Sequence, residues 1–162
     1  MKKIAIFLLF ISQICLAQEK LNDGDLRLRV SKAITQHIDR DLLGKTPTGF
    51  VYLFSVTLSF NEEGKIDTVF FPRKINENIN KVMKLNSTLV KIIIEQKSVY
   101  RIYASKLVFI PMLYHSIDDD KLDYRSGFLE SFENLLPDIV NSSSRSWLIL
   151  NPLVEIFGPP RK

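Results

Sequence analysis

The sequence predicts an α+β fold: a small antiparallel sheet of three strands, open to extension by later segments, with helices packed against it. Residues 50–60 alternate apolar and polar side chains with the period of two that strands show. Residues 22–44 and 76–97 instead repeat their apolar side chains every three or four positions, as amphipathic helices do. Strand-like runs at 66–71 and 106–114 supply the other two strands of the sheet.

The length and composition are those of one folded domain. A chain of 162 residues is long enough for one ordinary domain and too short for two. Apolar residues make up 46%, aromatic residues 10% and charged residues 25%, a balance that excludes wholesale disorder and fibrous repeats. We expect a single α+β domain over residues 18–162, preceded by a segment of a different kind.

That segment, residues 1–17, has the layout of a cleaved secretory signal peptide. A positive Met-Lys-Lys head is followed by a mostly apolar stretch, and Cys15 and Ala17 are the small residues that a signal peptidase reads. We predict cleavage between Ala17 and Gln18. The apolar stretch is shorter than the ~20 residues that a membrane-spanning helix needs. No stable membrane span is therefore expected after cleavage, with an uncleaved anchor as the alternative.

Cleavage changes the chemistry that the chain can carry. Without Lys2 and Lys3, 20 of the 22 basic residues remain against 18 acidic ones, so the charge falls from +4 to about +2. The single cysteine, Cys15, leaves with the signal, and with it any disulfide, thiol nucleophile or thiolate ligand. Export without disulfides is common among bacterial envelope proteins. We expect an exported protein in the periplasm or outside a Gram-negative bacterium.

The first helix is predicted after the capping residues at 22–25. Its apolar side chains recur at helical spacing and form one stripe: Leu26, Val30, Ala33, Ile34 and Ile38. Gly44 closes the segment, because glycine is the common residue at the end of a helix.

A β-hairpin follows. Its first strand, 50–60, places aromatic and aliphatic side chains on one face and Ser55, Thr57 and Ser59 on the other. The Asn-Glu-Glu-Gly sequence after it is typical of a hairpin loop, with Gly64 suited to a positive φ. The returning strand, 66–71, ends at a proline.

Between residues 76 and 97 the helical period returns. The apolar face consists of Ile79, Val82, Met83, Leu89, Val90, Ile93 and Ile94. Asn86 would lie in the middle of this face in a continuous helix, so we expect a break there. Ser87 is the expected cap of a second helix that continues through Gln96.

The third strand, 106–114, contains a proline. Pro111 has no N–H to donate, which predicts either an edge position or a bulge for this strand. Residues 115–162 are expected to form an extension of the sheet-and-helix core. Within it, 128–136 has the pattern of a short helix that Pro137 ends, and two short strands at 147–150 and 153–157 are split by Pro152.

The densest cluster of oxygen and nitrogen ligands follows the third strand. His115 precedes three consecutive acids, Asp118, Asp119 and Asp120, residue types that calcium or zinc prefers. The spacing lacks the glycine and the final glutamate of an EF-hand. A solvated acidic loop after a strand is the competing interpretation.

Other enzyme and partner classes lack support. The strained Gly-x-Ser-x-Gly turn of serine hydrolases is absent from the sequence, as are phosphate-loop and dinucleotide glycine patterns. A charge near neutral, together with export, disfavours nucleic-acid binding. We therefore expect no cofactor and no nucleic-acid partner.

One resemblance to a known family follows from the hairpin and the third strand. Residues 54–60 (Phe-Ser-Val-Thr-Leu-Ser-Phe), 61–66 (Asn-Glu-Glu-Gly-Lys-Ile) and 67–69 read as strand, glycine hairpin and strand, and 108–112 (Val-Phe-Ile-Pro-Met) alternates around a proline. This order, over residues 30–114, resembles the C-terminal domain of the energy-transducing protein TonB and its secreted relatives. The resemblance implies a small α+β unit with a three-stranded antiparallel sheet.

The departures from that family bear on function. The family's Tyr-Pro before the first strand has no counterpart here, and a proline-rich linker is missing, so the resemblance does not imply energy transduction. In such folds an exposed sheet edge can accept a strand from a partner. The third strand is the candidate edge, with Val108, Ile110 and Met112 as its binding residues.

Three functional hypotheses result. The leading one is a non-catalytic protein-interaction module of the bacterial envelope, with an envelope or secreted protein as partner. The second is a small metal-dependent enzyme or metal-binding protein that uses His115 and the acids at 118–120. The third is a structural subunit that self-associates through Phe70, Phe71 and the segment around Trp147.

Overall fold

A computed structural model describes residues 22–96, 98–118, 128–141 and 144–158. The predicted signal peptide, residues 1–17, and its expected cleavage point at Ala17 and Gln18 lie outside these ranges. In the part of the chain that is described, no helix combines the length and the apolar character needed to cross a membrane.

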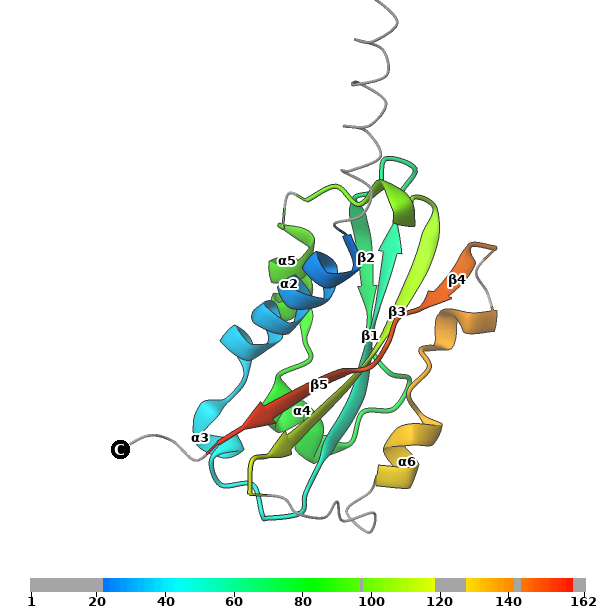
Figure 1. The fold of residues 1–162 in the computed structure, drawn as a ribbon. Helices are drawn as coiled ribbons and strands as arrows, with labels where there is room; N and C mark the ends of the chain where they lie inside the picture. Colours follow the sequence, from blue (N-terminus) through cyan, green and yellow to red (C-terminus); the bar gives the residue numbers. More distant parts are fainter. Residues whose placement is uncertain (1–21, 97, 119–127, 142–143, 159–162) are drawn as a thin grey trace, which may run out of the picture.

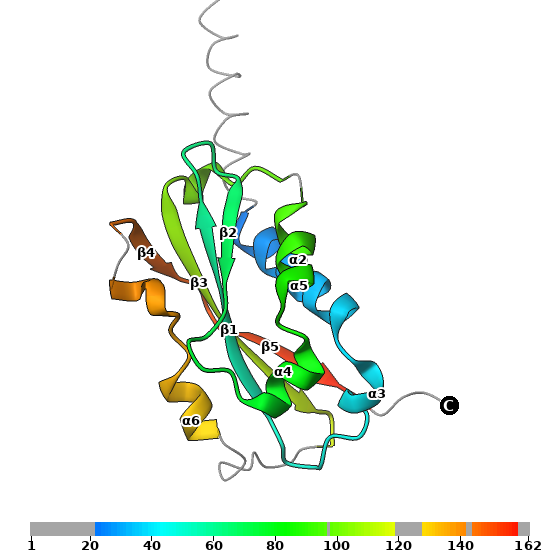
Figure 2. The ribbon, with the colours of Figure 1, turned by 180° about the vertical axis from the view of Figure 1, so that it is seen from behind.

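Among the described residues, four α-helices precede the third strand in the sequence. They are α2 (Asn22–His37), α3 (Arg40–Leu43), α4 (Glu77–Met83) and α5 (Ser87–Ile94). Helices α2, α4 and α5 lie along one face of the sheet, and α3 continues from the end of α2 (Figures 1 and 2). The stripe of α2 is buried at every predicted position, Leu26, Val30, Ala33, Ile34 and Ile38, so the prediction of this helix is confirmed.

The sheet is larger than the three strands that the sequence predicts. Its strands are β1 (Tyr52–Phe60), β2 (Ile66–Phe70), β3 (Lys106–Ser116), β4 (Ser146–Ile149) and β5 (Leu153–Phe157). Strands β2, β1 and β3 are antiparallel neighbours, as expected, but β4 and β5 both pair with β3 in parallel. The α+β class is confirmed, and the sheet is mixed rather than purely antiparallel.

Strand β3 lies inside the sheet, and the prediction that it forms an edge is wrong. One side pairs with β1; the other pairs first with β4 and then with β5. The N–H of Leu150 donates to the carbonyl of Phe109 at 2.9 Å, so the backbone of Phe109 points toward β4. Backbone direction alternates along a strand, so the nitrogen of Pro111 also points to that side. It faces the break between β4 and β5, where no ladder bond is lost.

The predicted hairpin is present, and its loop is hydrogen-bonded to a segment later in the chain. Gly64 has φ of +78°, and its carbonyl accepts from the N–H of Tyr100 at 2.7 Å. A Cβ at Gly64 would lie 2.7 Å from the carbonyl carbon of Tyr100. Glycine is therefore needed both for the backbone conformation and for this close approach.

The predicted helix break is confirmed, with a different cap. Helix α4 ends at Met83, and Lys84 takes a left-handed conformation with φ of 50°. The side chain of Asn86 accepts from two backbone N–H groups and caps α5, so Ser87 is the first helical residue and not the cap. The polar residue that interrupts the apolar face is thus the residue that restarts the helix.

The main core lies between the helices and the sheet. Phe54 and Tyr114 stack across β1 and β3 with ring centroids 5.8 Å apart. Near the hairpin, Phe60 packs against Tyr103 of the 3-10 turn η1 (Arg101–Tyr103) at 5.3 Å. The opposite face of the sheet carries only α6 (Phe128–Glu133) and the 3-10 turn η2 (Asp138–Asn141) among the described elements (Figure 1). A short helix in this region was predicted, and α6 confirms it.

Candidate functional site

The face of the sheet opposite α2, α4 and α5 carries the candidate site, because the elements that the structure describes cover this face only in part. The segment after α6 is anchored by Ser55, whose hydroxyl donates to the carbonyl of Leu135 at 2.5 Å. At the other end of this face, Arg145 contacts the hydroxyl of Ser59 and forms an ion pair with Asp67 at 3.0 Å. These contacts bury Ser55 and Ser59, the polar side of β1.

An apolar groove of about 470 Å³ lies between the sheet and the α6 segment. Every residue that lines it is apolar: Leu53, Phe109, Pro111, Met112, Leu113, Phe132, Leu135, Leu136, Pro152 and Val154. A small cluster of buried residues, Leu53, Phe109 and Leu135, forms its base. A groove of this volume without polar groups provides hydrophobic contact area but no group for acid–base chemistry.

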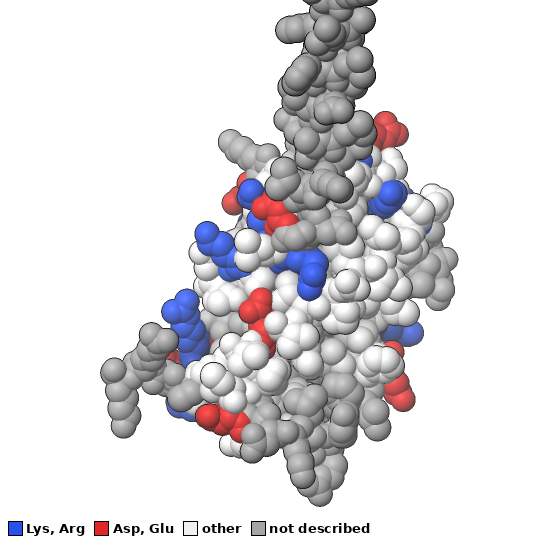
Figure 3. Space-filling view, viewed as in Figure 1, with Lys and Arg blue, Asp and Glu red and all other residues white. Residues whose placement is uncertain are grey.

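Several side chains around the groove remain exposed to solvent. Among the residues that line it, Phe132 is 62% exposed, Val154 53% and Leu136 49%. In the space-filling view, the surface over β5 and toward α6 is mostly free of lysine, arginine, aspartate and glutamate (Figure 3). Contiguous exposed apolar surface of this kind marks sites of binding in soluble proteins.

The groove borders a free sheet edge. The N–H of Ile117 donates to the carbonyl of Phe157 at 2.8 Å, so the backbone of Phe157 points toward β3. The backbone N–H and C=O groups of successive residues in a strand point to opposite sides, so those of Val154 and Ile156 point away from β3. On that side, no described strand pairs with β5. The side chain of Val154 lines the groove, whereas Ile156 is 60% exposed and is not one of the groove residues.

The structure places the predicted edge residues elsewhere. Val108, Ile110 and Met112 are fully buried, and all three belong to the core under the helices. Only Met112 also lines the groove. These residues do not form a free edge because β3 has partners on both sides, and all three pack in the main core.

The metal-site hypothesis is tested only in part. His115 lies at the end of β3, where its Nδ1 is 2.9 Å from the carbonyl oxygen of Ser116, and Asp118 lies just beyond. Asp119 and Asp120 lie outside the described residues. Over the ranges that are described, no group of three or more histidine, cysteine, aspartate or glutamate side chains is arranged to hold a metal ion. A metal site that includes the two outer acids stays a prediction.

Comparison with known proteins gives no relative on which to draw. Neither a protein-family model nor a curated protein matches the chain, and neither does a solved structure. The resemblance to the TonB C-terminal domain stays a prediction for residues 30–114. The parallel pairing of β4 and β5 with β3 is an addition to the three-stranded unit which that resemblance implies.

The groove residues were not predicted as a site, although two signals were present. Residues 153–157 are apolar at four of five positions, so apolar side chains reach both faces of β5. The sequence predicts Phe132 and Leu136 on the apolar side of a short helix, but it does not predict which part of the sheet that side contacts. The groove forms only when these segments meet β3, which requires knowledge of the parallel pairing.

Proposed function

We propose that this protein is an exported, non-catalytic interaction module that binds an extended apolar segment of another envelope or secreted protein. The partner segment adds as a strand to the outer edge of β5, and every second side chain enters the groove. The observation that carries this proposal is the free edge of β5 directly beside an all-apolar groove.

The outer edge of β5 and the apolar groove would contribute differently to recognition of the partner. Backbone hydrogen bonds at Val154 and Ile156 would provide affinity for any extended chain. The groove would select apolar residues at alternate positions, because side chains of a strand point to opposite faces every second residue. The lining offers no partner for a buried polar side chain, so a charged residue at such a position would be rejected.

Site-specific photocrosslinking tests the proposal. A p-benzoyl-phenylalanine side chain placed at position 156 should crosslink one envelope or secreted protein, and mass spectrometry should map the contact to an extended apolar segment. The matched control is the same side chain at position 28, because Leu28 is 67% exposed on α2, away from the groove. Equal crosslinking from both positions would contradict the proposal.

A backbone variant separates strand addition from simple hydrophobic contact. Val154→Pro removes an N–H that points away from β3, so the pairing with β3 should survive and the crosslink at position 156 should be lost. Val154→Ala keeps the N–H and should retain most of the crosslink. Retention of the crosslink in a folded Val154→Pro protein would show that the partner does not bind as a strand.

A further inference from the structure

A second concave site lies on the other side of β5, between that strand and helices α2 and α3. It has a volume of about 390 Å³, at the small end of the range for ligand pockets. It is lined by Thr35, Ile38, Arg40, Leu43, Gly44, Tyr114, Glu155, Ile156, Phe157 and Gly158. Unlike the groove, this pocket combines apolar walls with charged and hydroxyl groups.

One of the lining residues is a buried tyrosine whose hydroxyl is not satisfied. Tyr114 is 3% exposed, and its Oη is buried without a hydrogen-bond partner of good geometry among the described residues. Burial raises the pKa of Tyr114 to about 12, and the nearby hydroxyls of Thr35 and Ser31 offset only part of that rise. The phenol therefore stays protonated at neutral pH and can both donate and accept.

The second polar group is a carboxylate that is only partly used. Glu155 is half-buried on β5, and the hydroxyl of Ser31 donates to its Oε1. A carboxylate can accept about four hydrogen bonds, so this contact leaves Glu155 able to accept from a ligand. Together with Tyr114 and Thr35, it makes this side of the pocket rich in hydrogen-bond acceptors.

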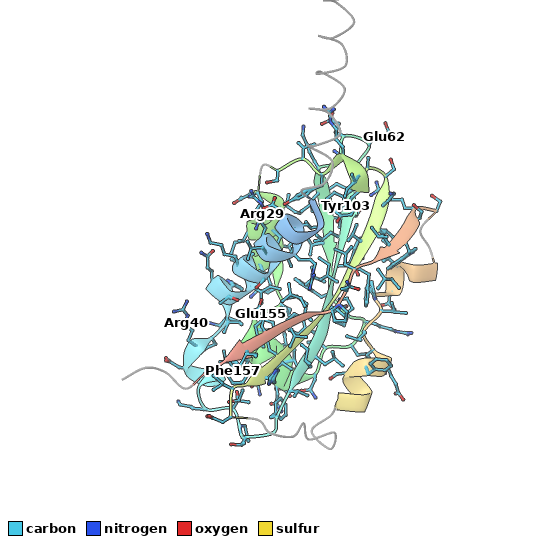
Figure 4. All side chains as sticks on the ribbon, in the orientation of Figure 1. Arg29, Arg40, Glu62, Tyr103, Glu155 and Phe157 are labelled. Atoms are coloured by element: carbon cyan, nitrogen blue, oxygen red, sulfur yellow. The ribbon has the colours of Figure 1, made fainter. Side chains whose placement is uncertain are left out.

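Arg40, the positively charged residue of the pocket, is more exposed to solvent than Glu155. Arg40 begins α3 and is exposed, whereas Glu155 and Phe157 come from β5 on the opposite side (Figure 4). An ion pair with an exposed side chain is weak because water screens it, and a half-buried, hydrogen-bonded carboxylate is a stronger point of attachment. The pocket therefore favours a cationic ligand over an anionic one.

We propose that this pocket binds a small organic amine, with its ammonium group on Glu155 beside Tyr114 and its apolar body against Ile38, Leu43 and Phe157. The ammonium N–H groups match the acceptor-rich side of the pocket, and the aliphatic and aromatic walls match a hydrocarbon or aromatic body. This site shares no residue with the groove and shares Ile156 with the proposed strand-addition edge, but its preference for an amine does not depend on the strand-addition proposal.

A series of three probes of matched shape tests the charge preference. The full chain is expressed, the exported protein is purified, and 2-phenylethylamine, 2-phenylethanol and 3-phenylpropanoate are titrated while the backbone amide resonances are followed. We expect the amine to shift the amides of α2, α3 and β5, with an affinity at least about tenfold above that of the alcohol. Tighter binding of the propanoate, lost in Arg40→Gln, would overturn the proposal, as would the absence of shifts with all three probes.

Two variants assign the binding to the named groups. Glu155→Gln keeps an oxygen for Ser31 but removes the charge, and should weaken binding of the amine about tenfold while leaving the alcohol unchanged. Tyr114→Phe removes only the hydroxyl and should weaken binding of the amine several-fold. Glu62→Gln, in the distant hairpin loop (Figure 4), is the matched control and should bind as the parent does. Equal amine affinity in Glu155→Gln and the parent protein would contradict the assignment.

Discussion

The face of the sheet under α2, α4 and α5 is covered by several elements, whereas the described elements on the opposite face are one short helix and the 3-10 turn after it. On the first face the side chains of β1 and β3 are buried, with Phe54 1% exposed and stacked on Tyr114. On the second face a comparable aromatic residue, Phe132, is 62% exposed at the rim of a groove. The first face supplies the packed core, and the second leaves apolar surface exposed to solvent.

The largest expected effect is the difference in stability between a variant of the packed face and a variant of the open face. Phe54→Ala should destabilise the protein by about 3–5 kcal/mol, because it removes a fully packed aromatic ring from the core. Phe132→Ala should change the free energy of unfolding by less than about 0.5 kcal/mol, because the ring is mostly in water. Urea unfolding of both variants measures the difference. Similar losses in the two variants would remove the distinction between a packed face and an open one.

A smaller effect is expected where the hairpin meets the connection after α5. Gly64→Ala should cost about 1–3 kcal/mol from its left-handed backbone alone, with a further cost from the approach of Tyr100. Gly158→Ala is the control, because its nearest heavy atom to an added Cβ is 3.8 Å away. Thermal unfolding should show a clear decrease in midpoint for the first variant and almost none for the second.

The smallest effect tests how the α6 segment is held. Ser55→Ala removes the hydrogen bond to the carbonyl of Leu135 and should cost about 0.5–1.5 kcal/mol. Hydrogen exchange should become faster in residues 128–136 while the protection of α2 and α5 is kept. Unchanged exchange in residues 128–136 would mean that packing on Phe109 and Leu53, and not this hydrogen bond, anchors the segment.

Local features of the fold were predictable from the sequence, and long-range ones were not. The stripe of α2, the Gly64 hairpin, the break at Asn86 and the split at Pro152 each depend on residues that are close in the chain. The pairing of β4 and β5 with β3 joins residues about 40 apart, and no local pattern specifies which side of β3 they take. The edge prediction failed for this reason: Pro111 allowed either an edge or an irregularity, and the choice depended on strands that follow much later.

The candidate site was less predictable than the fold because it is made of residues from separate segments. Leu53, Phe109, Leu135 and Val154 come from four elements, and each has an ordinary place in a strand or in the turn after a helix. The pocket on the other side of β5 is similar, since Tyr114 and Glu155 become neighbours only after the parallel pairing forms. Sequence motifs pointed instead to His115 and the acids after it, because those residues are adjacent in the chain.

The late position of β5 has a consequence during synthesis on the ribosome. The outer side of β3 from Met112 to Ser116 pairs only with β5, so it stays open until residues 153–157 have emerged. Until then a nascent chain presents an unpaired apolar strand to chaperones and to other copies of itself. A premature stop between residues 117 and 152 would make that transient exposure permanent, and such truncated chains should be degraded or aggregate rather than accumulate as soluble fragments.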